Sequence, residues 1–259
     1  MAEEAPAAAV PDLLRRLTVP VAIAVVAVVA LAWYVTWASS DLMNHLTAPT
    51  SVGSTNLALF FALIVVMMVA MMLPSALPMV LAYHGLTRLE GGRPVKPADA
   101  VATVAFLIPN FVVWGSFGVA ALLGLMALGL MGSMLVGPAL LIPAATLVAA
   151  GAWQVTRTKE VCLSHCTSPM SFVLHHWRSG RIGAMRMGFR HSVYCIGCCW
   201  LFMLVLFISG SMSLLWMGGL SVVIFAEKLG VRTLLFVRVI GVLLVALGAL
   251  AAFGALVAM

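Results

Sequence analysis

Long apolar runs alternate with short polar segments along this chain, and their lengths are typical of helices that cross a bilayer. Such a helix needs about 20 mostly apolar residues. Seven stretches meet or approach this length, at about residues 19–38, 57–84, 100–126, 135–155, 191–209, 212–226 and 233–257. The pattern therefore predicts an all-α fold, a polytopic membrane helix bundle of about seven transmembrane helices.

The composition supports this class of protein. The chain is 64% hydrophobic and 8% charged, whereas soluble domains average roughly 45–50% and 25%, so a soluble globular protein is excluded. The start, MAEEAPAAAVPD, is typical of a disordered tail, which we expect to cover residues 1–18. Residues 19–259 then form a single transmembrane domain, with a cytoplasmic Cys/His-rich loop at residues 156–190.

The basic residues predict how the bundle is oriented. With seven spans, all 14 Lys and Arg residues fall on the same side of the membrane. They are Arg15, Arg16, Arg88, Arg93, Lys96, Arg157, Lys159, Arg178, Arg181, Arg186, Arg190, Lys228, Arg232 and Arg238. Cytoplasmic loops carry such an excess of positive charge. We therefore expect a multi-pass protein of the cell membrane with a cytoplasmic N-terminus. The net charge of +6 reflects these loops, so we expect the partner to be the lipid bilayer and no nucleic acid.

Soft metal-binding groups are concentrated at the start of the fifth predicted span, in HSVYCIGCCW. Residues three and four positions apart share one face of a helix. His191, Cys195, Cys198 and Cys199 have this spacing, so one imidazole and three thiols point the same way if the segment is helical. A buried cysteine is often only a small apolar side chain, but all five cysteines of the chain lie between residues 162 and 199. The clustering favours a metal or redox site.

The preceding segment supplies the other two cysteines. Cys162, His165 and Cys166 lie in VCLSHCTSPM, and His175 and His176 follow in SFVLHHWRSG. Adjacent histidines point about 100° apart on a helix, so we expect only one of this pair, His176, among the ligands. Thiolates and imidazoles select Cu(I), Zn(II) or iron–sulfur clusters. The basic residues Arg157, Lys159, Arg186 and Arg190 are expected to lower the pKa values of the thiols.

A methionine-rich stretch, VVMMVAMMLPSALPMV, lies in the second predicted span. Thioether sulfur prefers Cu(I) to hard ions and needs no deprotonation, so the stretch could carry an ion through an apolar medium. Its residues on the possible transfer path are Met67, Met68, Met71, Met72 and, at the end of the span, His84. The alternative is simple packing, for which methionine is well suited.

Ionisable residues inside a predicted span often mark function. Glu227 and Lys228 end the sixth predicted span. For Glu227 we weigh a functional role against a position at the cytoplasmic surface, paired with Lys228 or with an arginine.

Four motifs resemble a bacterial family of predicted metal-binding integral membrane proteins. They are MMVAMMLPSALP at 67–78, CLSHCTSP at 162–169, HHWRSGRIGAMRMGFRHSVYCIGCCW at 175–200 and the LLWMGGL…EK run at 214–228. The resemblance covers roughly residues 57–230 and implies a membrane fold and a bound metal, but no settled reaction. Ser164 departs from the family pattern, where an arginine is expected, and Ser192 stands in place of a glycine.

The sequence favours a membrane protein that handles or transports copper as Cu(I), with zinc or another transition metal as the alternative. The predicted metal ligands are Cys162, Cys166, Cys195, Cys198, Cys199, His191, His165 and His176. A metallochaperone or a periplasmic protein is a possible partner. Two alternatives stay open, a membrane thiol-disulfide oxidoreductase that uses CIGC and a membrane copper metalloenzyme, so the sequence does not settle whether the protein is an enzyme.

Overall fold

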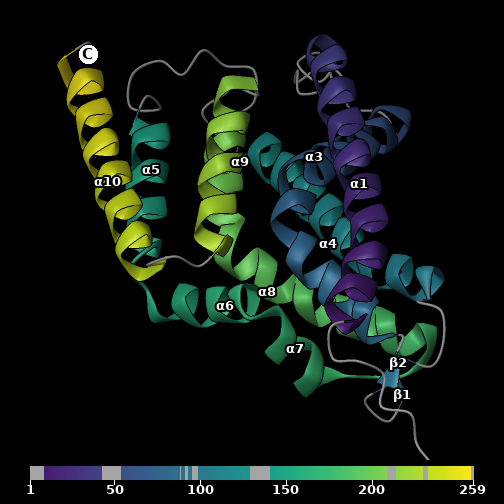
Figure 1. The fold of residues 1–259 in the computed structure, drawn as a ribbon. Helices are drawn as coiled ribbons and strands as arrows, with labels where there is room; N and C mark the ends of the chain where they lie inside the picture. The colour runs from purple at the N-terminus through teal and green to yellow at the C-terminus, as the bar shows by residue number, and fades with distance from the viewer. Residues whose placement is uncertain are drawn as a thin grey trace, which may run out of the picture.

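A computed structural model describes residues 9–42, 54–87, 89–90, 93–94, 99–128, 141–208, 214–229 and 233–257. Nearly all of these residues are helical (Figure 1). The helices are α1 (Ala9–Ala38), α3 (Ser54–Leu86), α4 (Ala100–Ala127), α5 (Leu141–Trp153), α6 (Arg157–Thr167), α7 (Pro169–His176), α8 (Gly180–Ile208), α9 (Leu214–Leu229) and α10 (Thr233–Val257). Two short strands, β1 (Leu89–Glu90) and β2 (Arg93–Pro94), pair antiparallel between α3 and α4. The predicted all-α membrane bundle is confirmed.

Five of the described helices are long and apolar enough to cross a membrane, namely α1, α3, α4, α8 and α10. The fourth and sixth predicted spans correspond to shorter helices, α5 with 13 residues and α9 with 16. Residues 129–140, which include the predicted start of the fourth span, lie outside the described part of the chain. The protein is thus compatible with a multi-pass topology, and its predicted orientation stays a prediction.

Two predicted boundaries differ from the structure. Helix α1 begins at Ala9, inside the tail expected at residues 1–18, whose first eight residues lie outside the description. The segment 156–190, expected as a loop, consists mostly of α6, α7 and the first turns of α8. Local signals explain this: the Thr156 hydroxyl caps α6 by accepting from the Lys159 N–H, and Pro169 occupies the first turn of α7.

Glycines allow α8 to approach its neighbours closely. A Cβ on Gly188 would collide with the Phe106 carbonyl of α4, and a Cβ on Gly197 would lie 2.5 Å from Cys162 Sγ of α6. Small residues at helix contacts serve this purpose in membrane proteins. Helix α8 is therefore held between α4 and α6, and α6 and α7 lie across one end of the bundle (Figure 1).

Candidate metal centre

Three cysteines of α8 form one buried face, as their spacing predicts. Cys195, Cys198 and Cys199 are each about 1% exposed. The Sγ atoms of Cys198 and Cys199 are 3.1 Å apart, and the Cys198 thiol donates to the Cys195 carbonyl at 3.2 Å. These three thiols are excluded from solvent and lie within one turn of each other.

The two cysteines of α6 pack onto the same face. Cys162 Sγ lies over Gly197, and the Cys166 thiol interacts with that of Cys198. We call Cys162, Cys166, Cys195, Cys198 and Cys199 the thiol cluster. All five are free thiols and belong to one apolar core. The packing of α6 on α8 thus brings together side chains that are up to 37 positions apart, from 162 to 199.

Basic residues do not lower the pKa of Cys162, contrary to our sequence-based expectation. Partial burial raises the pKa of this thiol, and the neighbouring Cys199 raises it further. Lys159 is engaged elsewhere: its ammonium is 2.8 Å from a carboxylate oxygen of Glu227. Arg186 and Arg190 are exposed and line other cavities.

Glu227 is buried, which contradicts one of the two positions weighed for it, the exposed one at the cytoplasmic surface. It is about 1% exposed and accepts hydrogen bonds at 2.8 Å from both Lys159 and Gln154. The pair ties α6 to α9 beside the thiol cluster, where the Lys159 ammonium also lies 4.6 Å from the centroid of the Phe202 ring. Sequence reasoning considered Lys228 or an arginine as the partner and overlooked Lys159.

Sequence reasoning noted Lys228 as an ionisable residue at the end of a span but did not place it at the thiol cluster. It is 6% exposed, and its Nζ donates to Ser75 Oγ at 3.1 Å and to Cys195 Sγ at 3.5 Å. The indole of Trp114, otherwise without a hydrogen-bond partner, also lies against the Cys195 thiol. A lysine within an apolar run was the available signal, but only the fold shows that it points at a thiol.

The four methionines predicted for the transfer path all lie in the same core as the thiol cluster. Met67, Met68, Met71 and Met72 are at most 2% exposed, and all belong to that core. His84 lies about 18 Å further along α3, since a helix rises 1.5 Å per residue over the 12 positions from Met72. It contacts the Thr103 hydroxyl of α4 at 2.9 Å. The structure therefore joins the methionines to the thiols and leaves His84 apart.

His191 occupies a separate apolar niche one turn before Cys195. Its ring is 4% exposed and lies 5.9 Å from the ring of Phe106 and 5.7 Å from that of Phe172. Neither ring nitrogen has a hydrogen-bond partner. Buried polar groups are nearly always paired, so these nitrogens are free to receive a ligand.

The other two candidate histidines, His165 and His176, line a polar cavity of about 470 Å³ between α6 and α7 together with His175, and we call it the histidine cavity. His165, His175 and His176 each place Nδ1 within 2.8–2.9 Å of a carbonyl oxygen one turn earlier. A carbonyl only accepts, so Nδ1 carries the proton and a neutral ring keeps its Nε2 lone pair for a metal. Phe172 lines this cavity and contacts His191, so His191 lies just behind its wall.

Within the described residues, no group of three or more Cys, His, Asp or Glu side chains is already arranged around one ion position. The closest donors form a pair, the thiols of Cys198 and Cys199. Two thiolates are enough for Cu(I), which accepts a linear pair of soft ligands, whereas a tetrahedral zinc site needs four. This closest pair of thiols therefore suits Cu(I) better than zinc.

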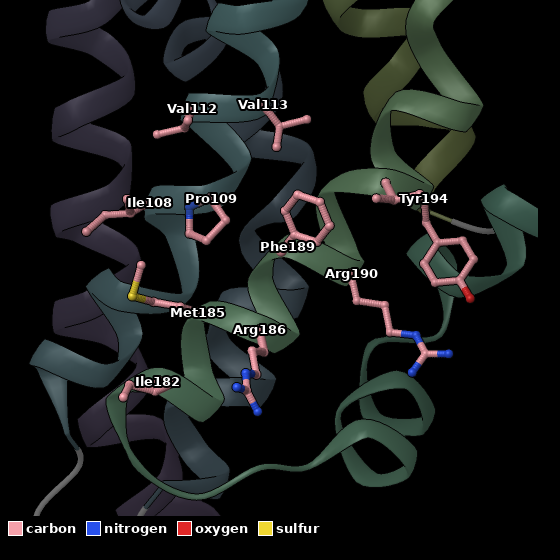
Figure 2. Close-up of a pocket in the computed structure, with 11 residues that line it drawn as sticks. Ile108, Pro109, Val112, Val113, Ile182, Met185, Arg186, Phe189, Arg190 and Tyr194 are labelled. Atoms are coloured by element: carbon pink, nitrogen blue, oxygen red, sulfur yellow. The ribbon is translucent and has the colours of Figure 1, made fainter.

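Two further cavities adjoin the N-terminal half of α8, and they share Arg186 and Arg190. The larger, of about 870 Å³, is an apolar groove between α4 and α8 (Figure 2). The smaller, of about 560 Å³, is lined by His175, His176, Trp177 and Arg178 as well. Neither cavity contains a thiol among its lining residues.

The sequence was also compared with known proteins. Residues 61–251 match the model of a protein family described as PpoB2, copper chaperone. No curated protein and no solved structure matches the chain. The family match includes the thiol cluster, the four methionines and Lys228.

Proposed function

The chain belongs to the PpoB2 copper chaperone family, and we propose that it is an integral membrane protein that binds Cu(I) on the thiol cluster. The observation that carries this proposal is the convergence of two sequence segments, α6 and α8, on one group of five thiols, of which all but Cys162 are buried. Soft thiolate ligands stabilise Cu(I), and exclusion of water protects the bound ion from oxidation.

The protein then passes the ion on by exchange between soft ligands. Met67, Met68, Met71 and Met72 share the core with the thiols, and thioethers bind Cu(I) without releasing a proton. Thiolates hold the ion tightly and the thioethers more weakly, so an ion displaced from the cysteines is released stepwise along α3. A partner protein with a copper site is the expected acceptor.

Loading is proposed to begin at the histidine cavity, because it is the polar opening next to the site. His165 and His176 line this cavity, and His191 lies behind Phe172, one turn from Cys195. An ion moving inward thus meets imidazoles first and thiols afterwards. In this scheme the three histidines are transient ligands and the cysteines are resident ones.

Elemental analysis of chelator-free protein, purified without oxygen, tests the binding step. We expect near-stoichiometric copper in the wild type, and Cys198→Ser and Cys199→Ser should lose it. Cys198→Ala removes the ligand without burying a hydroxyl, so it should lose copper as well if the thiolate is the ligand. Ser221→Ala is a matched control, because Ser221 is a buried small residue of the same region whose hydroxyl donates to the Met71 carbonyl at 3.4 Å. Wild-type protein that retains no copper would refute the proposal.

The 3.1 Å Cys198–Cys199 contact also supports the second candidate function, a thiol-disulfide oxidoreductase. In that case Lys228 would stabilise the attacking thiolate of Cys195. Mass spectrometry after alkylation separates the two functions. A redox enzyme isolated in air should contain a disulfide and no copper, whereas a copper carrier should contain thiols that copper protects from alkylation.

A further inference from the structure

Lys228 is a buried cation without a carboxylate partner in the described part of the chain. Glu227, the adjacent acidic residue, is already neutralised by Lys159 at 2.8 Å. The groups near Lys228 that can become negative are the thiols of Cys195, Cys199, Cys198 and Cys166, and its Nζ donates to Cys195 Sγ at 3.5 Å. A buried charge is costly unless it is paired. Apolar packing therefore does not explain why a positive charge lies beside the thiol cluster.

We propose that Lys228 is the counter-ion of the copper–thiolate complex and selects a monovalent over a divalent metal. This inference rests on the proposed function of the thiol cluster. Two neutral thiols that exchange two protons for one Cu(I) become a complex with a net charge of −1, which the ammonium balances. The same two thiolates with Zn(II) are neutral and leave Lys228 uncompensated.

The argument holds for any number of thiolates. With equal ligands, the Cu(I) complex is always one unit more negative than the Zn(II) complex, and a fixed positive charge stabilises the more negative one. The low-dielectric surroundings strengthen this difference, because Lys228 is 6% exposed and its Nζ is 3.5 Å from Cys195 Sγ. Ser75 Oγ, 3.1 Å away, holds the ammonium in position.

The test measures Cu(I) and Zn(II) affinities on the same full-length preparations by competition with chromophoric chelators, without oxygen. Lys228→Met removes the charge at similar length and should weaken Cu(I) binding by about 10- to 100-fold, the range seen when outer-shell partners of metal ligands are removed. Zn(II) affinity should stay the same or increase. Lys228→Arg keeps the charge and should preserve the wild-type preference.

The ratio of the two affinities does not depend on how much of each preparation is folded, so a partly misfolded variant still gives an answer. An unchanged Cu(I)/Zn(II) ratio in Lys228→Met would overturn this inference and leave the thiol site intact. Wild-type protein that fails to bind Cu(I) would instead refute the proposed function itself.

A second, independent observation concerns the two cavities that share Arg186 and Arg190. The apolar groove is lined by Ile108, Val112, Phe189 and other apolar side chains, and both arginines border it toward α7 (Figure 2). The smaller cavity adds Arg178 and two histidines. Within the described residues, none of these arginines has a carboxylate within ion-pair distance. A cationic recess thus joins an apolar groove at one end of the bundle.

We infer that this pair of cavities binds an anionic phospholipid, with its phosphate at Arg186 and Arg190 and an acyl chain along the groove. Arginine pairs well with phosphate oxygens, and basic recesses next to membrane helices bind anionic head groups. Arg186 and Arg190 lie one helical turn apart and line both cavities. A phospholipid can therefore place its phosphate at the arginines and its acyl chain in the adjoining apolar groove.

Phosphatidylglycerol retention by detergent-purified full-length protein, measured by native mass spectrometry against phosphatidylcholine, tests this site. The double variant Arg186→Gln/Arg190→Gln should lower retention by about 10- to 30-fold, as expected for two basic contacts near an anionic surface. Val112→Trp, which fills the groove, should also lower it. Arg157→Gln/Arg181→Gln removes the same net charge outside both cavities and should have little effect. Equal losses in both double variants, or displacement of the lipid by inorganic phosphate alone, would overturn the inference.

Discussion

The thiol cluster and the histidine cavity both contain groups that bind transition metals, yet their surroundings are opposite. The cysteines of α8 are about 1% exposed and lie beside a buried ammonium. The histidines line a polar cavity, and each imidazole is oriented by a carbonyl of its own helix. A buried site of thiols, which become anionic only when they lose their protons, should retain a soft ion, whereas a solvated site of neutral imidazoles should exchange it. In the proposed function, one region of sequence would supply both the binding step and the loading step.

The largest expected effect is on Cu(I) affinity, and it should distinguish the thiol cluster from the histidine cavity. Cys199→Ser should weaken Cu(I) binding by more than about 100-fold, because a hydroxyl is a poor ligand for a soft ion and loss of a ligand exceeds the 10- to 100-fold effect of an outer-shell change. The double variant His165→Ala/His176→Ala should leave the affinity close to that of the wild type and slow the loading rate. Chelator competition and stopped-flow loading measure the two quantities. A large loss of Cu(I) affinity in the histidine variant would show that the histidines and the cysteines form one binding site.

Gly197→Ala should disturb the thiol cluster without changing any ligand. The new methyl group would lie 2.5 Å from Cys162 Sγ, so the Cys162 thiol must rotate away or α6 must shift relative to α8. Overpacking of this kind lowers the free energy of unfolding by about 1–3 kcal/mol. Copper affinity should fall because the cysteines of α6 no longer sit correctly against those of α8. Gly218→Ala is the control, because a methyl group there meets nothing within 4 Å. Thermal unfolding in detergent and copper affinity should both distinguish the two variants.

His191→Leu tests the connection between the two regions. Removing a buried imidazole with no hydrogen-bond partner should stabilise the copper-free protein by roughly 1–3 kcal/mol, the cost of an unsatisfied polar group. The same change should slow copper loading, because the ion loses its ligand between the cavity and the thiols. A variant that is more stable and loads copper at the wild-type rate would remove His191 from the path.

The smallest effect is expected at the methionines. Met71→Leu conserves volume and should cost less than about 1.5 kcal/mol. It should slow copper transfer to an acceptor several-fold and hardly change copper retention. Met187→Leu serves as the matched control, since Met187 is equally buried but packs in the other apolar core, around Tyr83 and Phe106. Equal transfer rates in the two variants would favour simple packing for the stretch in α3.

Much of this organisation could be predicted from the sequence, because it depends on local periodicity. Spacing at three and four residues was sufficient to place Cys195, Cys198 and Cys199 on one face of α8, and the apolar runs were sufficient to identify the membrane bundle. The bounds of the shorter helices α5 and α9 were harder to predict, since a run of apolar residues does not show where a helix ends.

The missing part of the prediction was tertiary. No local pattern shows that Lys228 points at Cys195 while its neighbour Glu227 pairs with Lys159, because adjacent helical residues face different partners. Likewise, a list of thiols and imidazoles does not reveal that the fold buries the former and leaves His165 and His175 near solvent. Charge pairing across α6, α8 and α9 is set by how the helices pack.

X-ray absorption spectroscopy at the copper K-edge tests the central claim most directly, on full-length protein loaded with one equivalent of Cu(I) without oxygen. The account predicts a first coordination shell of sulfur, unchanged in His165→Ala/His176→Ala and altered in Cys199→Ser. A shell of nitrogen that disappears in the histidine variant and persists in the cysteine variant would contradict it.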